Sequence, residues 1–179
     1  TAVIEGMTVS GTCEVSVRRK VTKTGTATIY TNTGYFTFAN STTYQSTSTQ
    51  SGITVSVTNV STRNANYMEI GRRSNGQNYN GTVSLSSTTI EDFSVTGVTF
   101  TYSAYDYAQG TVTCDDGGTY TAPTNNSTTA TWALAAGSSD PVFTMDVRTV
   151  TSSSWLGTTT RYWNRLVSMV VTYTYSDYE

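Results

Sequence analysis

Residue types that carry proton-transfer chemistry are sparse in this sequence. The chain of 179 residues has no His, and it has 12 acidic and 10 basic residues. General acid–base catalysis would therefore depend on carboxylates, on Tyr or on the two lysines, Lys20 and Lys23. The adjacent carboxylates Glu91 and Asp92 are predicted to lie on a strand, where neighbouring side chains point to opposite faces and cannot flank a glycosidic bond together. We expect that this protein is not an enzyme.

The segment Asp115-Asp116-Gly117-Gly118 has two interpretations. Its carboxylates could supply oxygen ligands to Ca²⁺, which is a hard cation with a high coordination number. Asp-Gly is also the dipeptide that a tight turn requires. We favour the turn and keep a calcium site at Asp115 and Asp116 as the alternative. The sequence predicts no other cofactor.

The two cysteines, Cys13 and Cys114, leave a second question open. Neither belongs to a Cys-x-x-Cys motif and the chain has no His, so a zinc site is not expected. A disulfide between them would close a loop of about 100 residues and stabilise the fold by up to about 4.7 kcal/mol in the chain-entropy model. The alternative is two buried free thiols that pack as small apolar side chains.

Aromatic residues in loop-like contexts are the candidates for ligand binding. A sugar-binding site needs an exposed ring, which stacks on the C–H-rich face of the sugar, beside side chains that hydrogen-bond its hydroxyl groups. Trp155 lies in a Ser/Thr-rich stretch and is either such a platform or an anchor that folds a loop onto the protein. Trp132 is expected in the core instead. The candidate ligand-binding residues are Trp155, Tyr162, Tyr105, Tyr107, Tyr79, Asn78 and Arg72.

The composition excludes several classes of partner. Charged residues make up 12% of the chain and the net charge is −2, which gives no electrostatic basis for binding nucleic acid or an anionic membrane. No apolar segment reaches the length of about 18 residues that a membrane helix requires. Few lysines, abundant Ser, Thr and Asn, and an even number of cysteines together indicate an oxidising, extracellular setting.

Hydrophobic alternation in short segments predicts the elements that must position these residues. The longest apolar-dense segment is 166–175, and its core face is expected to carry Val167, Met169, Val171, Tyr173 and Tyr175. Segment 13–21 alternates in the same way and is expected to be a half-exposed strand. Segments 26–31 and 34–39 are expected to form a hairpin, while 40–51 is either a loop or a polar edge strand.

These segments together predict the fold class. Roughly ten or more short strands at intervals of about ten residues, with no helical period, indicate an all-β protein. We expect a single domain over 1–179, built as an antiparallel β-sandwich of jelly-roll or Greek-key type. A detached N-terminal strand within 1–10 is compatible with this arrangement.

The second half of the chain, roughly residues 90–175, resembles secreted bacterial β-sandwich modules. The resemblance rests on the succession Gly97-Val98-Thr99-Phe100-Thr101-Tyr102, Gly117-Gly118-Thr119-Tyr120, Ala130-Thr131-Trp132, Val142-Phe143 and Leu166 to Tyr173. Those modules are carbohydrate-binding or adhesion jelly rolls on surface proteins of gut-type bacteria. The sequence departs from their pattern where Ala133-Leu134, rather than Gly, follows Trp132.

Two functions of different classes follow from these observations. The leading hypothesis is a non-catalytic module, extracellular or on the cell surface, that binds a glycan or another host or cell-surface ligand. The alternative is a structural subunit of a virion or phage surface, or of a surface filament that exchanges strands. The short segment Ala2-Val3-Ile4 could then add to the open sheet edge of a neighbour, which requires a homo-oligomer.

Overall fold

A computed structural model describes residues 17–103, 111–123, 127–146, 149–154, 157–162 and 165–179. All regular secondary structure in these ranges is β-strand, and every strand ladder is antiparallel. The predicted all-β, antiparallel sandwich is therefore confirmed. Within the described ranges, no helix is long and apolar enough to cross a membrane.

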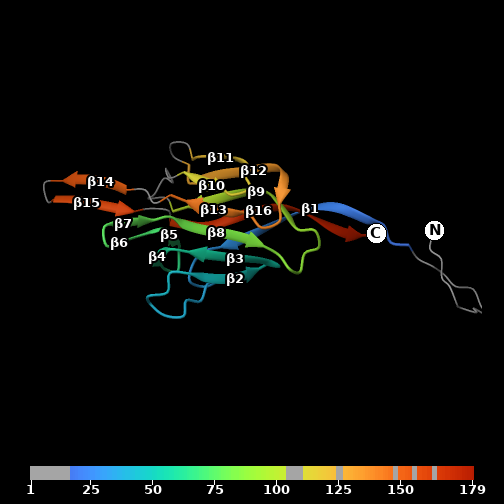
Figure 1. Ribbon diagram of the computed structural model, residues 1–179, viewed down its shortest axis with the longest axis horizontal. Coiled ribbons are helices and arrows are strands. Elements are labelled where there is room, and N and C mark those ends of the chain that lie inside the picture. The colour runs from blue at the N-terminus through green and yellow to red at the C-terminus, as the bar shows by residue number, and fades with distance from the viewer. Residues whose placement is uncertain (1–16, 104–110, 124–126, 147–148, 155–156, 163–164) are drawn as a thin grey trace, which may run out of the picture.

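Two main sheets and two separate hairpins make up the described part of the molecule (Figure 1). The larger sheet has the order β11 (Thr119–Thr121), β12 (Thr129–Ser138), β9 (Ser94–Tyr102), β16 (Arg165–Tyr178), β5 (Met68–Ile70) and β4 (Val60–Arg63), and β1 (Lys20–Tyr30) also pairs with β16. The smaller sheet has the order β10 (Val112–Cys114), β13 (Val142–Met145), β8 (Gly81–Ser86), β3 (Ile53–Thr58) and β2 (Ser46–Gln50). The hairpins are β6 (Arg72–Ser74) with β7 (Gln77–Tyr79), and β14 (Thr149–Ser154) with β15 (Gly157–Tyr162). In Figure 1 the hairpin β14–β15 lies at one end of the long axis and the C-terminus lies towards the other.

The core lies between the two sheets because each strand turns its apolar alternate residues inward. On β3 the residues Ile53, Val55 and Val57 are fully buried while the intervening Thr and Ser are half-buried. Phe100 of the larger sheet and Phe143 of the smaller one meet edge to face with ring centroids 5.3 Å apart. Aromatic contacts of this kind connect the two layers.

The C-terminal strand β16 lies within the larger sheet, and its core face differs in part from the predicted one. Met169 and Val171 are buried as expected, and the half-buried Tyr173 packs against the core. The third buried residue is Leu166, whereas Val167 and Tyr175 are only half-buried. The register of β16 against β9 shifts between Leu166 and Ser168. This bulge inserts one residue and exchanges the faces of the side chains on either side of it.

The first part of the chain departs further from expectation. The strand predicted over 13–21 is confirmed only at Lys20 and Val21 of its described part, where β1 begins. Arg18 and Arg19 lie outside β1, and Val17 is 86% exposed. The predicted hairpin of 26–31 with 34–39 is wrong. β1 pairs instead with residues 168–178 of β16, and 34–39 is an irregular segment with Phe36 buried. The alternative of a polar edge strand within 40–51 is confirmed by β2.

Candidate functional site

The β6–β7 hairpin brings together two of the predicted ligand-binding residues. Arg72 and Tyr79 are directly opposite in its register, and Asn75 and Gly76 form the turn with φ of 50° and 78°. Opposite residues of an antiparallel pair project from the same face. Asn78 is opposite Arg73, one position along, so it belongs to the other face of the hairpin. The site therefore includes Arg72 and Tyr79 but not Asn78.

The guanidinium of Arg72 packs against two aromatic rings. Its Cζ lies 4.1 Å from the ring centroid of Tyr44 and 4.5 Å from that of Tyr79. Both distances lie within the range of a cation–π interaction, which is stronger where water is partly excluded. Tyr44 is 41% exposed, so a large part of its surface stays available to a ligand.

Asn59 fixes this arrangement from the end of β3. Its Oδ1 accepts a long hydrogen bond of 3.4 Å from Arg72 Nε, and its Nδ2 donates to the carbonyl oxygen of Asn80 at 2.7 Å. Its own carbonyl oxygen accepts from the amide of Gly71 at 2.7 Å. Asn59 has φ of 52°, a left-handed conformation that Asn tolerates better than most residues.

The loop that carries Tyr44 is held in place by Arg63. The Arg63 guanidinium donates to the carbonyl oxygens of Asn40, Ser41 and Thr43, at 3.3, 2.6 and 3.0 Å. It also lies 4.5 Å from the ring centroid of Phe38. Arg63 is therefore engaged in loop structure, and Tyr44 is presented by a preorganised segment.

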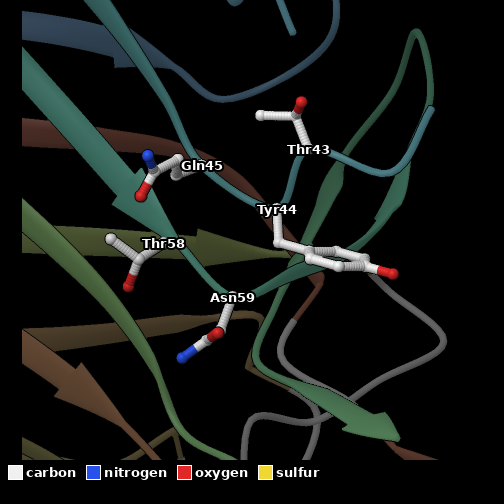
Figure 2. Close-up of a pocket in the computed structure, with 5 residues that line it drawn as sticks. All are labelled: Thr43, Tyr44, Gln45, Thr58 and Asn59. Carbon is white, nitrogen blue, oxygen red and sulfur yellow. The ribbon is translucent and has the colours of Figure 1, made fainter. Parts of the chain in front are cut away.

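A shallow hollow of about 310 Å³ opens beside this cluster. We call it the Tyr44 hollow, and its lining residues are Thr43, Tyr44, Gln45, Thr58 and Asn59. In Figure 2 the ring of Tyr44 extends to one side, while the polar groups of Gln45, Thr58 and Asn59 lie on the other. A second hollow of about 430 Å³ shares Thr43, Gln45 and Thr58 and continues along β2 and β3. The surface combines an aromatic ring with hydroxyl and amide groups, which is the chemistry that recognises sugars.

The other predicted ligand-binding residues do not join this cluster in the described structure. Trp155, Tyr105 and Tyr107 lie outside the described residues. Tyr162 ends β15 with its backbone opposite Thr149, and its side chain is not among the described groups. The stretch around Trp155 was expected to be a loop, but strands β14 and β15 flank it as a hairpin.

The Asp115–Asp116 segment forms the expected turn. Gly117 and Gly118 have φ of 84° and 90°, and Asp115 Oδ1 accepts hydrogen bonds from the amides of Val142 and Asp116 at 2.8 and 3.0 Å. Asp116 Oδ2 accepts from the hydroxyl of Ser138. No group of three or more His, Cys, Asp or Glu side chains that could hold a metal ion occurs among the described residues, and calcium binding at Asp115 and Asp116 stays a prediction.

The predicted disulfide is not tested by the structure, because Cys13 lies outside the described residues. Cys114 is half-buried, and its Sγ lies 3.6 Å from Asp115 Oδ1. Pairing of Cys114 with Cys13 stays a prediction.

The premise that Glu91 and Asp92 point in opposite directions is wrong. They lie in a turn before β9, where Asp92 has φ of 51°, and both contact Lys20 Nζ, at 3.0 and 2.6 Å. Hydrogen bonds from Tyr178 and Lys20 lower the pKa of Glu91, and those from Lys20 and Ser176 lower the pKa of Asp92. A glycosidase acid needs a raised pKa, so this pair is unsuited to that role.

Comparison with known proteins leaves the site to be interpreted from its own geometry. No protein-family model, no curated protein and no solved structure matches this chain.

Sequence reasoning found Arg72 and Tyr79 through the turn-rich segment around them, but it missed Tyr44 and Asn59. Tyr44 lies in an aperiodic Ser/Thr-rich stretch, and Asn59 follows an ordinary strand pattern. An Asn directly after a strand is a weak signal for a left-handed turn residue. No local signal marks Tyr44, because its contact with Arg72 joins segments that are distant along the chain.

Proposed function

We propose that this protein is a non-catalytic binding module, extracellular or on the cell surface, that binds carbohydrate through the Tyr44 hollow. The observation that carries the proposal is the packing of Arg72 against Tyr44 and Tyr79 beside a hollow lined by hydroxyl and amide groups. A half-exposed ring supplies a stacking surface, and Gln45, Thr58 and Asn59 supply hydrogen-bond donors and acceptors.

The supporting features are those of a preformed site. The loop with Tyr44 is held by three hydrogen bonds from Arg63, and the Tyr44 carbonyl oxygen accepts from the amide of Val60 at 2.9 Å. A site that is ordered before binding loses less conformational entropy when the ligand arrives. The open shape of the hollow fits a chain-like ligand lying on the surface better than a small molecule enclosed in a cleft.

A glycan array with matched variants tests this proposal. The wild-type protein should bind a subset of glycans, and Tyr44→Ala should weaken that binding about tenfold, which corresponds to about 1.4 kcal/mol. The control is Tyr178→Ala, which removes a ring of similar exposure, 46%, at the C-terminal end of β16. Array signals at background would contradict the proposal, and glycan binding that survives Tyr44→Ala unchanged would place it away from the hollow.

A structural subunit is the second candidate function, and the open edge of β1 favours it. In the described part of the chain, β1 pairs only with β16. Arg19 and Glu179 exchange both backbone hydrogen bonds. In an antiparallel pair such residues alternate with residues that bond on the other side, so the backbone N–H and C=O groups of odd-numbered residues in β1 point to β16 and those of even-numbered residues point away from it. The backbone groups of Thr22, Thr24, Thr26 and Thr28 therefore point away from the sheet.

One end of this edge is closed by a side chain. Gln50 Nε2 donates to the carbonyl oxygen of Tyr30 at 2.8 Å, and Gln50 Oε1 accepts from the amide of Tyr30 at 2.9 Å. The buried Gln50 amide thus takes the place of a neighbouring strand at Tyr30, and the edge before it stays open to strand addition.

Light scattering over a wide concentration range tests the structural candidate. Strand addition between copies predicts a mass that rises above the 19.3 kDa of one chain. A mass that stays at one chain at the highest attainable concentration would contradict it. The proposed donor segment, Ala2-Val3-Ile4, lies outside the described residues.

A further inference from the structure

We infer that the Tyr44 hollow takes an acidic sugar, and that Arg72 binds the carboxylate or sulfate group of that sugar. The inference rests on the proposed carbohydrate function and names the class of ligand. It starts from a cation that has no acidic partner among the described residues.

Arg72 has no acidic partner in the described part of the chain. The ion pairs found there involve Lys20, Lys23 and Arg165. Arg63, the other arginine near the hollow, donates to backbone carbonyl oxygens. The hydrogen bond that Arg72 donates runs from Nε to the neutral amide oxygen of Asn59. A guanidinium keeps its full charge at every physiological pH, so Arg72 is a fixed positive charge beside the hollow.

The surroundings of Arg72 define the direction from which an anion can approach. The rings of Tyr44 and Tyr79 pack on the guanidinium, 4.1 and 4.5 Å from its Cζ. Stacking of this kind uses the π faces of a guanidinium and leaves its in-plane N–H donors available. Nε is directed to Asn59, and the two Nη groups have no hydrogen-bond acceptor among the described residues. Their fork geometry matches two oxygens of one carboxylate or sulfate group.

The hydrogen-bond network extends from Arg72 to one carboxylate, but through two neutral amides. Arg72 contacts Asn59, Asn59 Nδ2 contacts the carbonyl oxygen of Asn80, and Asn80 Nδ2 donates to Asp146 Oδ1 at 2.8 Å. Asp146 is exposed and in contact with water, which screens its charge. The groups that line the hollow are neutral, and the positive charge beside it comes from Arg72 and Arg63. The Nη groups of Arg63 are bound to backbone carbonyl oxygens, so Arg72 is the arginine placed to bind an anion there.

The remaining groups of the site suit the rest of a sugar ring. Tyr44 offers an aromatic face, and Thr43, Gln45 and Thr58 offer neutral donors and acceptors for hydroxyl groups. A ligand with a single anionic group on a polyhydroxylated ring satisfies all of these groups at once. A purely neutral sugar leaves the charged donors of Arg72 without an ionic acceptor.

Calorimetric titration with defined oligosaccharides tests the inference. The probes are de-esterified oligogalacturonate, which carries carboxylates, the same oligomer fully methyl-esterified, a heparin-derived oligosaccharide, which also carries sulfates, and a neutral oligogalactan. We expect de-esterified oligogalacturonate, the heparin-derived oligosaccharide or both to bind at least tenfold tighter than the neutral and esterified probes. The two acidic arms show whether carboxylate or sulfate is preferred. The affinity should fall as salt concentration rises.

Variants of Arg72 test whether this residue causes the preference for acidic oligosaccharides. Arg72→Gln should abolish the preference for the acidic probe, and Arg72→Lys, which keeps the charge but loses the fork, should retain only part of it. Arg19→Gln is the control, because it removes a charge next to β1 and leaves the hollow unchanged. If Arg72→Gln fails to fold, the affinities of the wild-type protein for de-esterified and methyl-esterified oligogalacturonate still show whether the site requires an acidic group.

The outcomes separate this inference from the proposed function. Equal affinity for the acidic and neutral oligosaccharides, or a preference that survives in folded Arg72→Gln, would overturn the acidic ligand and leave carbohydrate binding in place. Binding of no glycan of any class would overturn both.

Discussion

Gly118 lies against the indole of Trp132, where an added methyl group has no room. A Cβ at this position would lie 2.5 Å from Trp132 Nε1 and 2.7 Å from the carbonyl oxygen of Ala133, and its φ of 90° is unfavourable for any L-residue with a side chain. Trp132 itself is fixed by a hydrogen bond of 2.8 Å from Nε1 to the carbonyl oxygen of Gly117. The steric clash and the backbone strain therefore act together.

We predict that Gly118→Ala lowers the free energy of unfolding by about 3 kcal/mol, measured by chemical denaturation. The matched control is Gly117→Ala, because Gly117 has φ of 84° but no atom within 4 Å of the place that an added Cβ would take. Gly117→Ala should lower the free energy of unfolding by about 1 kcal/mol, because it introduces backbone strain without a steric clash. Equal losses in the two variants would refute the contact with Trp132 as the cause.

The buried hydroxyl group of Tyr102 allows a second test of how a single residue affects stability. Its oxygen is buried and makes no hydrogen bond of normal geometry with a described residue, and the same holds for the hydroxyl of Tyr120, which interacts with it electrostatically. A buried hydroxyl without a partner costs desolvation free energy. Tyr102→Phe should therefore leave the free energy of unfolding unchanged or raise it by about 1 kcal/mol in urea denaturation. A clear loss of stability would show that this hydroxyl has a partner.

The contrast between Trp132 and Tyr44 shows what the sequence reveals about single residues. Trp132 sits within an alternating segment, so its place in the core was predictable, and it is 2% exposed. Tyr44 sits in an aperiodic segment, and its role depends on a hairpin that follows later in the chain. Local patterns predict burial, but they do not encode which distant side chain a residue meets.

Strand β1 offers the sharpest prediction among the elements. Its even-numbered residues direct their backbone N–H outward, while its odd-numbered residues bond to β16. Proline lacks an N–H, so it is tolerated on the open side of an edge strand and not on the bonded side. Thr26→Pro should cost no more than about 1 kcal/mol, whereas Ala27→Pro should cost about 3 kcal/mol or more, both by chemical denaturation.

Thr26→Pro also tests whether copies of the chain associate by strand addition at β1. Thr26→Pro should prevent any self-association detected by light scattering, and Thr26→Val, which keeps the N–H and a β-branched side chain, should preserve it. A larger stability loss in Thr26→Pro than in Ala27→Pro would contradict the assignment of the open edge.

The alternation of apolar residues predicted the positions of several strands but not how all of them pair. Alternation located β3, β8, β9, β12 and β13, because one face of each strand is buried. It gave β1 the wrong partner, since the pairing of β1 with β16 joins opposite ends of the chain. It also missed the bulge in β16, which is a property of the ladder and leaves no mark in the pattern of apolar residues.

Charged residues are sparse in this chain, and the ion pairs of its described part involve Lys20, Lys23 and Arg165. Lys20 joins the start of β1 to Glu91 and Asp92, and Tyr178 and Ser176 of β16 donate to the same carboxylates at 2.7 and 2.6 Å. These bonds lower the pKa values of Glu91 and Asp92 and raise the pKa of Lys20. With no His in the chain, no side chain with an ordinary pKa titrates between pH 5 and 8.

The pH dependence of stability follows from the direction of these shifts. A carboxyl group whose pKa is lowered by folding contributes stability above its unfolded pKa of about 4 and loses it as pH falls through the folded pKa. Lys20, with a raised pKa, contributes stability below its unfolded pKa and loses it only at strongly alkaline pH. The melting temperature should be level from pH 5 to 8 and fall below about pH 4. Asp92→Asn should reduce the fall in melting temperature at acid pH. A melting temperature that falls with pH as it does in the wild type would contradict the role of Asp92.

At the scale of the molecule, the two sheets enclose an apolar core, and the Tyr44 hollow lies at the surface where β2, the end of β3 and the β6–β7 hairpin approach one another. The most direct test of this account is to map glycan-induced chemical-shift changes of backbone amides by NMR. We predict that a bound acidic oligosaccharide shifts the amides of 43–45, 58–59 and 72–79 most strongly. Changes confined to other surfaces, such as the open edge of β1, would contradict it.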